Sequence, residues 1–325
     1  MRAPYLAVAL IVSGCTTTPT TQISAFGDST NAIIGKVDSV LDEYNNTTLD
    51  RQFTSYAATY SGDNANKLTS DILKIIDTPI KPEQRKNLAM YNANKALGQY
   101  SKALSDLANA GSRADIDLAA ANLYGSISGI NGQYKTLKDT QDNLFDTNKL
   151  ANFSTLIAAI GSTIVEEKRG EAIKGIVTEA DANVSLLCDT INEQLRTSGI
   201  EVAIATSRQG ILSEELDDYH SRAKATVPLD KRRAEIKRLY SLQQEVFNSK
   251  LLVQQSQKAI LAVKDAHATL AKELKAGRFN SSTITLTIGR LKDLEKHYDD
   301  FQTVLLSCKK ITKNKEGVLS CDDKQ

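Results

Sequence analysis

The sequence predicts an all-α protein, built as an elongated antiparallel bundle of long, coiled-coil-like helices. Apolar residues recur at steps of three and four along most of the chain, as on one face of a helix, and the alternation typical of strands is rare. Only Pro79, Pro82 and Pro228 follow residue 22. A proline inside a helix costs about 3 kcal/mol, so this sparse use leaves room for very long helices.

The expected helices are separated by short breaks rich in glycine, serine, asparagine and proline. The first carries an apolar stripe from Ile23 to Tyr44, whose register then slips as in a coiled-coil stutter before the chain stops at Ser61-Gly62-Asp63. The run 282–288 has the composition of a strand but has no partner strand, so we expect a helix there too. We expect the other helices at residues 64–76, 83–109, 113–146, 150–165, 173–197, 200–226, 229–276 and 284–308.

The clearest helical pattern lies between Leu229 and Ala276. From Leu239 a seven-residue repeat holds for five cycles, and eight of its eleven seam positions are apolar. This repeat predicts knobs-into-holes packing against another helix. An unbroken helix over this range would be about 70 Å long. The seam positions are Leu239, Leu242, Val246, Ser249, Val253, Ser256, Ile260, Val263, His267, Leu270 and Leu274.

The first fifteen residues have the order of a secretory signal. Arg2 precedes the apolar run 6–12, which is far shorter than the roughly 20 residues that a membrane-spanning helix needs. Val12-Ser13-Gly14-Cys15 resembles the lipobox of bacterial lipoproteins, in which an aliphatic residue and two small ones precede a cysteine. The resemblance implies that Cys15 is lipidated and that the preceding peptide is removed. The alternative is an ordinary signal peptide with a chance cysteine.

This resemblance and the helical pattern together divide the chain into four parts: a signal peptide at 1–14, a lipidated polar tether at 15–22, a helical bundle domain at 23–312 and a C-terminal tail at 313–325. Residues 16–21 are polar and contain a proline, which suits a solvated tether. Thr16 stands where an aspartate would imply retention in the inner membrane. By resemblance to that sorting rule, we expect the outer membrane, facing the periplasm, in a source that has one.

The charge balance disfavours several kinds of partner. Arg2 is the only charged residue before Cys15, so 39 of the 40 basic residues remain in the mature chain against 39 acidic ones. A net charge near zero implies neither a nucleic-acid binder nor a polybasic membrane binder. The chain has no tryptophan and few aromatic residues, which also disfavours stacking on single-stranded nucleic acid.

Three cysteines remain after Cys15. Cys308 and Cys321 are separated by twelve residues, and a disulfide between them is our first choice, worth about 3 kcal/mol by loop entropy. Cys188 would then be a buried free thiol, as its place on an apolar stripe suggests. Pairing of Cys188 with Cys308, or of Cys188 with Cys321, stays open.

Two short motifs resemble the GDSL-type esterases. Phe26-Gly27-Asp28-Ser29 resembles the nucleophile block of that family. Asp217-Asp218-Tyr219-His220 has the Asp-x-x-His spacing of the block that supplies its base. Carried over, Ser29 would be the nucleophile, His220 the base and Asp217 its orienter. The family's context is missing, because the residues before Ser29 have helical rather than strand periodicity and no blocks for an oxyanion hole follow. The esterase is therefore a remote alternative, and we expect a protein that is not an enzyme.

No motif for a cofactor or a metal is present. The sequence lacks Gly-x-Gly-x-x-Gly, a P-loop and His-Glu-x-x-His, so we expect no cofactor. The three histidines have no ligand spacing, so we expect no metal site. His267, on the seam, is expected to be packed and hydrogen-bonded. The other two are His220 and His297.

The leading interpretation is a membrane-anchored, non-enzymatic scaffold or adaptor in the bacterial cell envelope. Its expected partners are the membrane, through the lipid, and another envelope protein or a second copy, through helical faces. The alternative is a membrane-remodelling or pore-forming protein that releases the apolar segment 153–165. As a helix those thirteen residues reach about 20 Å, short of the roughly 30 Å hydrocarbon core, so burial in the bundle is the favoured explanation.

Overall fold

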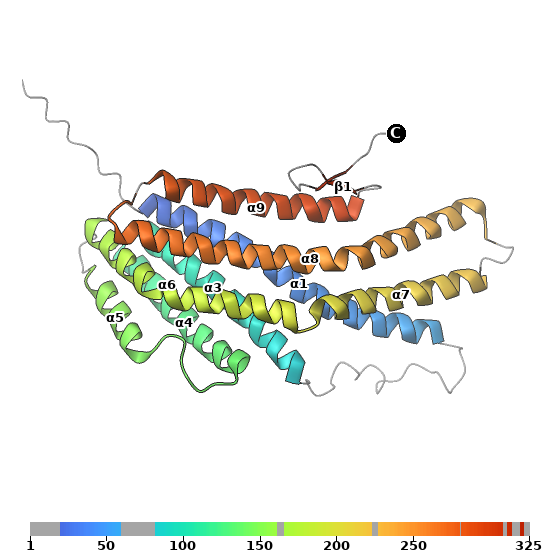
Figure 1. Ribbon diagram of the computed structural model, residues 1–325, viewed down its shortest axis with the longest axis horizontal. Helices are drawn as coiled ribbons and strands as arrows, with labels where there is room; N and C mark the ends of the chain where they lie inside the picture. Colours follow the sequence, from blue (N-terminus) through green and yellow to red (C-terminus); the bar gives the residue numbers. More distant parts are fainter. Residues whose placement is uncertain are drawn as a thin grey trace, which may run out of the picture.

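The computed structural model describes residues 20–59, 82–160, 166–222, 227–279, 281–307, 311–313 and 319–321, and it confirms the all-α prediction. Most of the helices run side by side along the long axis of the molecule (Figure 1). The helices are α1 (Thr20–Thr59), α3 (Pro82–Asn109), α4 (Arg113–Lys138), α5 (Thr147–Ala158), α6 (Glu166–Thr197), α7 (Ile200–Arg222), α8 (Leu229–Lys275) and α9 (Ser282–Ser307). Two short strands follow, β1 (Ile311–Lys313) and β2 (Leu319–Cys321).

Most helix limits fall close to the expected ones. α1 stays helical through the slip in its apolar stripe, and it begins at Thr20, inside the segment expected to be a tether. α8 is unbroken from Leu229 to Lys275 and turns at Gly277, whose φ of 72° is the left-handed conformation that glycine adopts readily. The helix expected at 64–76 and the end of the apolar segment, 161–165, lie outside the described residues.

The expectation for α4 was wrong at its C-terminus. The helix ends at Lys138 instead of continuing to residue 146, because Asp139 takes a left-handed conformation with φ 49° and ψ 47°. The chain then turns Phe145 into the core, where Asn131 holds its backbone. The Phe145 N–H donates to Asn131 Oδ1 at 2.7 Å, and Asn131 Nδ2 donates to the Phe145 carbonyl at 2.9 Å.

The sequence did not predict the two short strands near the C-terminus. β1 and β2 pair antiparallel, with Ile311 opposite Cys321 and Lys313 opposite Leu319, where no strand was expected. The strand-like run 282–288, by contrast, is helical in α9, as expected. Ser281 caps this helix, since its Oγ accepts from the Ile284 N–H at 3.2 Å.

The bundle has a thick part and a thin part, which we call the head and the arm. The head contains α3, α4, α5, α6 and α9 together with the first half of α1 and the second half of α8. The arm consists of α7, residues 47–59 of α1 and residues 229–250 of α8 (Figure 1). α6 and α7 follow one another end to end across Gly199, whose φ is 73°, whereas α1 and α8 pass unbroken through both parts.

The predicted seam of α8 is its buried face. Nine of the eleven seam positions are buried, and Leu242 and Val246 are partly buried. Further residues beside the seam, such as Leu252 and Ala259, are buried as well. The buried face is wider than that of a two-stranded coiled coil because α8 packs against α1, α6, α7 and α9.

α1 and α3 approach each other closely at Gly27. A Cβ built on Gly27 would lie 2.4 Å from the backbone oxygen of Ser101 and 2.9 Å from Ser105 Cβ. The same construction at Gly35, two turns later on α1, meets nothing within 4 Å. Only a glycine at position 27 therefore allows the observed spacing of these two helices.

Candidate functional site

A buried hydrogen-bonded relay joins three helices in the head. The Tyr100 hydroxyl on α3 lies 3.1 Å from His267 Nε2 on α8, and His267 Nδ1 lies 2.9 Å from Asp181 Oδ1 on α6. Phe26 meets the imidazole edge-on with ring centroids 6.0 Å apart. Burial, and then the charge of Asp181, raises the pKa of Tyr100 far above its usual range.

The residue types of this relay are those of a proton relay, but its side chains are packed in the hydrophobic core. Tyr100 and His267 are both fully or almost fully buried, and only Asp181 reaches the surface in part. His267 is thus packed and hydrogen-bonded, as its seam position predicted. The relay fixes the register of α3, α6 and α8 relative to one another.

The residues of the esterase motifs are not brought together. Ser29 is buried on α1, and its neighbour Asp28 accepts a hydrogen bond of 2.9 Å from Ser105 Oγ. Arg51, 22 residues further along the same unbroken helix, pairs with Glu214 on α7. At about 1.5 Å per residue this places Ser29 roughly 33 Å back along α1 from the region of α7 that carries Asp217 and His220.

The cysteines are described only in part. Cys188 is fully buried on α6 and forms no disulfide, and burial raises the pKa of its thiol. The two alternative pairings of Cys188 are therefore not observed among the described residues. Cys15 and Cys308 lie outside the described residues, so lipidation of Cys15 and the disulfide between Cys308 and Cys321 stay predictions.

The described part of the apolar segment 153–165 packs against the bundle. Phe153 is fully buried beside Phe145, with ring centroids 6.1 Å apart, and Leu156 packs directly over Gly175 of α6. α5 ends at Ala158. None of the helices described here combines the length and the apolar character that crossing a membrane requires.

Within the described part of the chain, no group of three or more histidine, cysteine, aspartate and glutamate side chains is placed to hold a metal ion.

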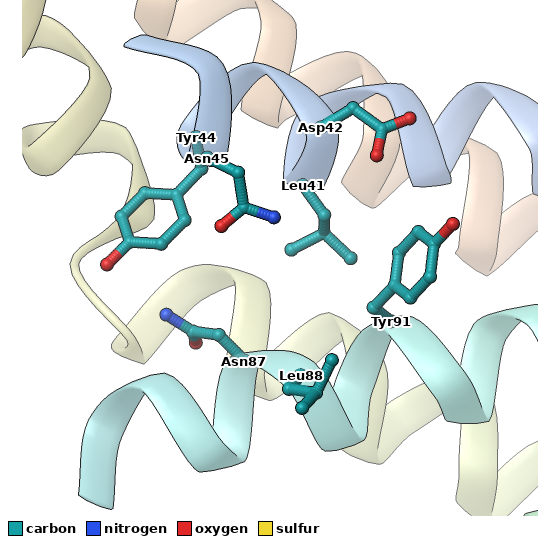
Figure 2. A pocket seen from close by; sticks show the side chains of 7 residues that line it. All are labelled: Leu41, Asp42, Tyr44, Asn45, Asn87, Leu88 and Tyr91. Carbon is teal, nitrogen blue, oxygen red and sulfur yellow. The ribbon is translucent and has the colours of Figure 1, made fainter. Parts of the chain in front are cut away.

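A groove between α1 and α3 is a candidate binding site on the described surface. It has a volume of about 330 Å³ and is open on one side. Figure 2 shows α1 above it and α3 below it, with Leu41 and Tyr91 between the two helices. Leu88 is 50% exposed although it is apolar. The groove is lined by Leu41, Asp42, Tyr44, Asn45, Asn87, Leu88 and Tyr91.

The groove is acidic at one end. Asp38 lies one turn before Asp42 on α1, and burial raises its pKa to about 6, with the charge of Asp42 adding to the rise. Asn94 opposes this rise, since its Nδ2 donates to Asp38 Oδ1 at 2.6 Å. The charge of Asp38 in turn raises the pKa of Tyr91.

The groove can therefore hold apolar or aromatic groups beside a cation. Tyr91 and Leu88 offer apolar surface, and Asp42 offers a carboxylate that a basic side chain would pair with, while Asp38 behind it adds to the negative charge that Lys95 offsets in part. Sequence reasoning did not select these residues. One signal was present, because two aspartates four residues apart on one helix repel each other and are unfavourable without a partner.

Comparison of the chain with protein-family models, with curated proteins and with solved structures finds no match in any of the three.

Proposed function

We propose that this protein is a lipid-anchored, non-enzymatic adaptor of the bacterial cell envelope. The lipobox-like Val12-Ser13-Gly14-Cys15 supports an anchor at Cys15, and Thr16 supports the outer membrane, facing the periplasm. The described bundle begins at Thr20, only five residues after Cys15, so the anchor would hold the first turn of α1 close to the membrane surface.

The observation that carries the adaptor role is the groove between α1 and α3. Apolar and aromatic side chains meet the Asp42 carboxylate there, Asp38 lies one turn away on α1, and Leu88 is half exposed. We infer that the partner is an envelope protein that lays a helix carrying basic and apolar side chains into this groove, with its apolar side chains on Leu88 and Tyr91. A basic side chain of that helix would pair with Asp42 and Asp38.

Cross-linking in intact cells tests this proposal. A photo-activated cross-linking amino acid replaces Leu88 in the groove, or Leu118 on α4 as a matched control, because Leu118 is also apolar and is 63% exposed. Each version is made with Cys15 and with Cys15→Ser, and purified through the C-terminus. Mass spectrometry identifies the cross-linked species.

The expected result is one envelope protein captured from position 88 and not from position 118. Capture should fall when Asp42 is changed to Lys, because the groove then repels a basic partner. Capture should also fall with Cys15→Ser, and that variant should leave the membrane fraction. Equal capture from both positions, or only links to the same chain, would exclude the groove as the adaptor site, while retention of Cys15→Ser in the membrane would exclude the anchor.

A further inference from the structure

An apolar stripe runs along the outer face of α8 in the arm, and we call it the α8 ridge. Its four members, Leu229, Ile236, Tyr240 and Phe247, are between 49% and 74% exposed. At about 100° per residue they fall within roughly 40° of one another, and they span about 27 Å. By the same spacing the seam positions of this stretch lie about 80–160° away around the helix, so the ridge faces away from most of the seam.

The ridge is flanked by basic side chains. Arg232, Arg233, Lys237 and Lys250 are all exposed and lie within roughly 80° of the ridge around the helix. Among the residues that the structure describes, none of these four forms an ion pair.

The carboxylates of the same stretch lie elsewhere. Asp230, Glu235 and Glu245 are about 100° or more from the ridge at the same helical spacing. Glu235 pairs with Arg222 of α7, at 3.4 Å. The outer face is therefore apolar and positive, although the mature chain is close to neutral as a whole.

With the described helices in place, Leu229, Ile236 and Phe247 of the ridge stay more than half exposed, and Tyr240, which has a contact of its own, stays about half exposed. α9 lies against α1 in the head, where Lys36 pairs with Asp299, and it ends at Ser307. In the arm α8 packs against α7 and α1 on its seam side, and its N-terminal turns extend beyond the end of α9 (Figure 1).

We propose that the α8 ridge binds the surface of a membrane that contains anionic lipid, and so lays the arm along that surface. A helix with Phe, Tyr, Leu and Ile on one face and Arg and Lys beside them has the composition of an interfacial helix. The apolar side chains enter the boundary between headgroups and acyl chains, and the cations meet lipid phosphates. This surface is distinct from the groove of the adaptor proposal, so either can hold without the other.

The charge favours lipid over a second copy of the chain. Two ridges facing each other would bring two sets of unpaired cations together, which repel. The few apolar side chains of one ridge give weak binding by themselves. On a protein that is already held at the membrane, the high effective concentration makes such weak binding sufficient.

Tryptophan fluorescence tests the ridge directly, because the chain contains no tryptophan. Phe247→Trp places a single reporter on the ridge, and Leu118→Trp places one on α4 as a matched exposed control. The mature lipidated protein, as isolated from cells, is incorporated into phosphatidylcholine vesicles with or without phosphatidylglycerol. Brominated lipids then quench any tryptophan that enters the bilayer, and flotation of the neutral vesicles reports the lipid anchor separately.

With phosphatidylglycerol present, the emission of the reporter at 247 should shift to the blue and be quenched, while that of the reporter at 118 should not. Adding Arg232→Gln and Arg233→Gln should shift the equilibrium between bound and free ridge by roughly 30-fold toward the free state. Circular dichroism checks that each variant keeps its helix content.

Three results would overturn the inference. The first is no quenching at 247 on vesicles that the protein demonstrably binds. The second is equal quenching at both positions, which means adsorption without a defined face. The third is a blue shift at 247 in the absence of lipid. If the shift rises with protein concentration, the ridge binds a second copy of the chain. If it appears on addition of an acidic amphipathic peptide, the ridge binds a protein partner.

Discussion

The hydroxyl of Tyr100 lies 3.1 Å from Nε2 of His267, and this buried hydrogen bond joins residues 167 positions apart in the chain. In a neutral imidazole only one ring nitrogen carries a proton, and a hydrogen bond to the Asp181 carboxylate places that proton on Nδ1. Nε2 is then an acceptor, and the Tyr100 hydroxyl donates to it.

Tyr100→Phe should destabilise the protein by about 1–3 kcal/mol, because it leaves Nε2 of a buried imidazole without a donor. Denaturant unfolding measures the change. Tyr124→Phe is the control, since the Tyr124 hydroxyl is bonded to Ser154 at the exposed surface and its loss should cost less than about 0.5 kcal/mol. If Tyr100→Phe costs the same in a His267→Leu background, the two residues are not coupled.

Gly27→Ala should destabilise the protein by about 1–3 kcal/mol, because its methyl group would press on the backbone of Ser101 and force α1 and α3 apart. Gly35→Ala on the same helix meets open space and should instead stabilise by up to about 1 kcal/mol through helix propensity. Thermal unfolding followed by circular dichroism compares the two. Effects of the same sign at both positions would contradict the close approach at Gly27.

Asp38→Asn should make the protein more stable than the wild type at about pH 7, and the difference should disappear near pH 4. Burial raises the pKa of Asp38 in the folded state from 3.8 to about 6. The stabilising contribution of the protonated group is therefore complete below the unfolded pKa and is lost as pH rises through the folded pKa.

Melting temperatures measured across this pH range check the prediction, with Asp142→Asn in the exposed loop after α4 as the control. Parallel curves for the wild type and Asp38→Asn would show that Asp38 is not desolvated. If the groove binds a cationic partner as proposed, the affinity of the wild type should rise over the same interval, because Asp38 becomes charged.

The number of reactive thiols should report the disulfide between Cys308 and Cys321. In the mature lipidated protein, unfolding without reductant should expose one thiol, that of Cys188, and unfolding with reductant should expose three. In the folded state even Cys188 should not react, because burial raises the pKa of its thiol. Cys188→Ala should abolish the one thiol that is seen without reductant, and three thiols without reductant would exclude the disulfide.

The sequence predicted the helices where a local signal marked their ends. Gly277 and Ser198-Gly199 stop helices where expected, and the seven-residue repeat identified the buried face of α8. The end of α4 was missed because the apolar pattern continues past Asp139 to Phe145. What turns the chain there is the side chain of Asn131, fourteen positions away from Phe145, and no local pattern shows that pairing.

The candidate surfaces were harder to predict than the fold. Leu41, Asp42 and Tyr91 form a groove only because α1 and α3 pack at a particular distance, which depends on the contact between Gly27 and Ser101. The net charge near zero also concealed the α8 ridge, because overall composition does not reveal which side of a helix carries its cations.

The break at Gly199 gives the molecule different mechanical properties in different directions. α1 and α8 cross the junction between head and arm as continuous hydrogen-bonded rods, and α6 and α7 are joined there by a single turn. Bending of the arm should therefore be softest at this junction. A lengthwise pull on the tip would instead travel along α1 as tension and arrive at Thr20, next to the proposed lipid.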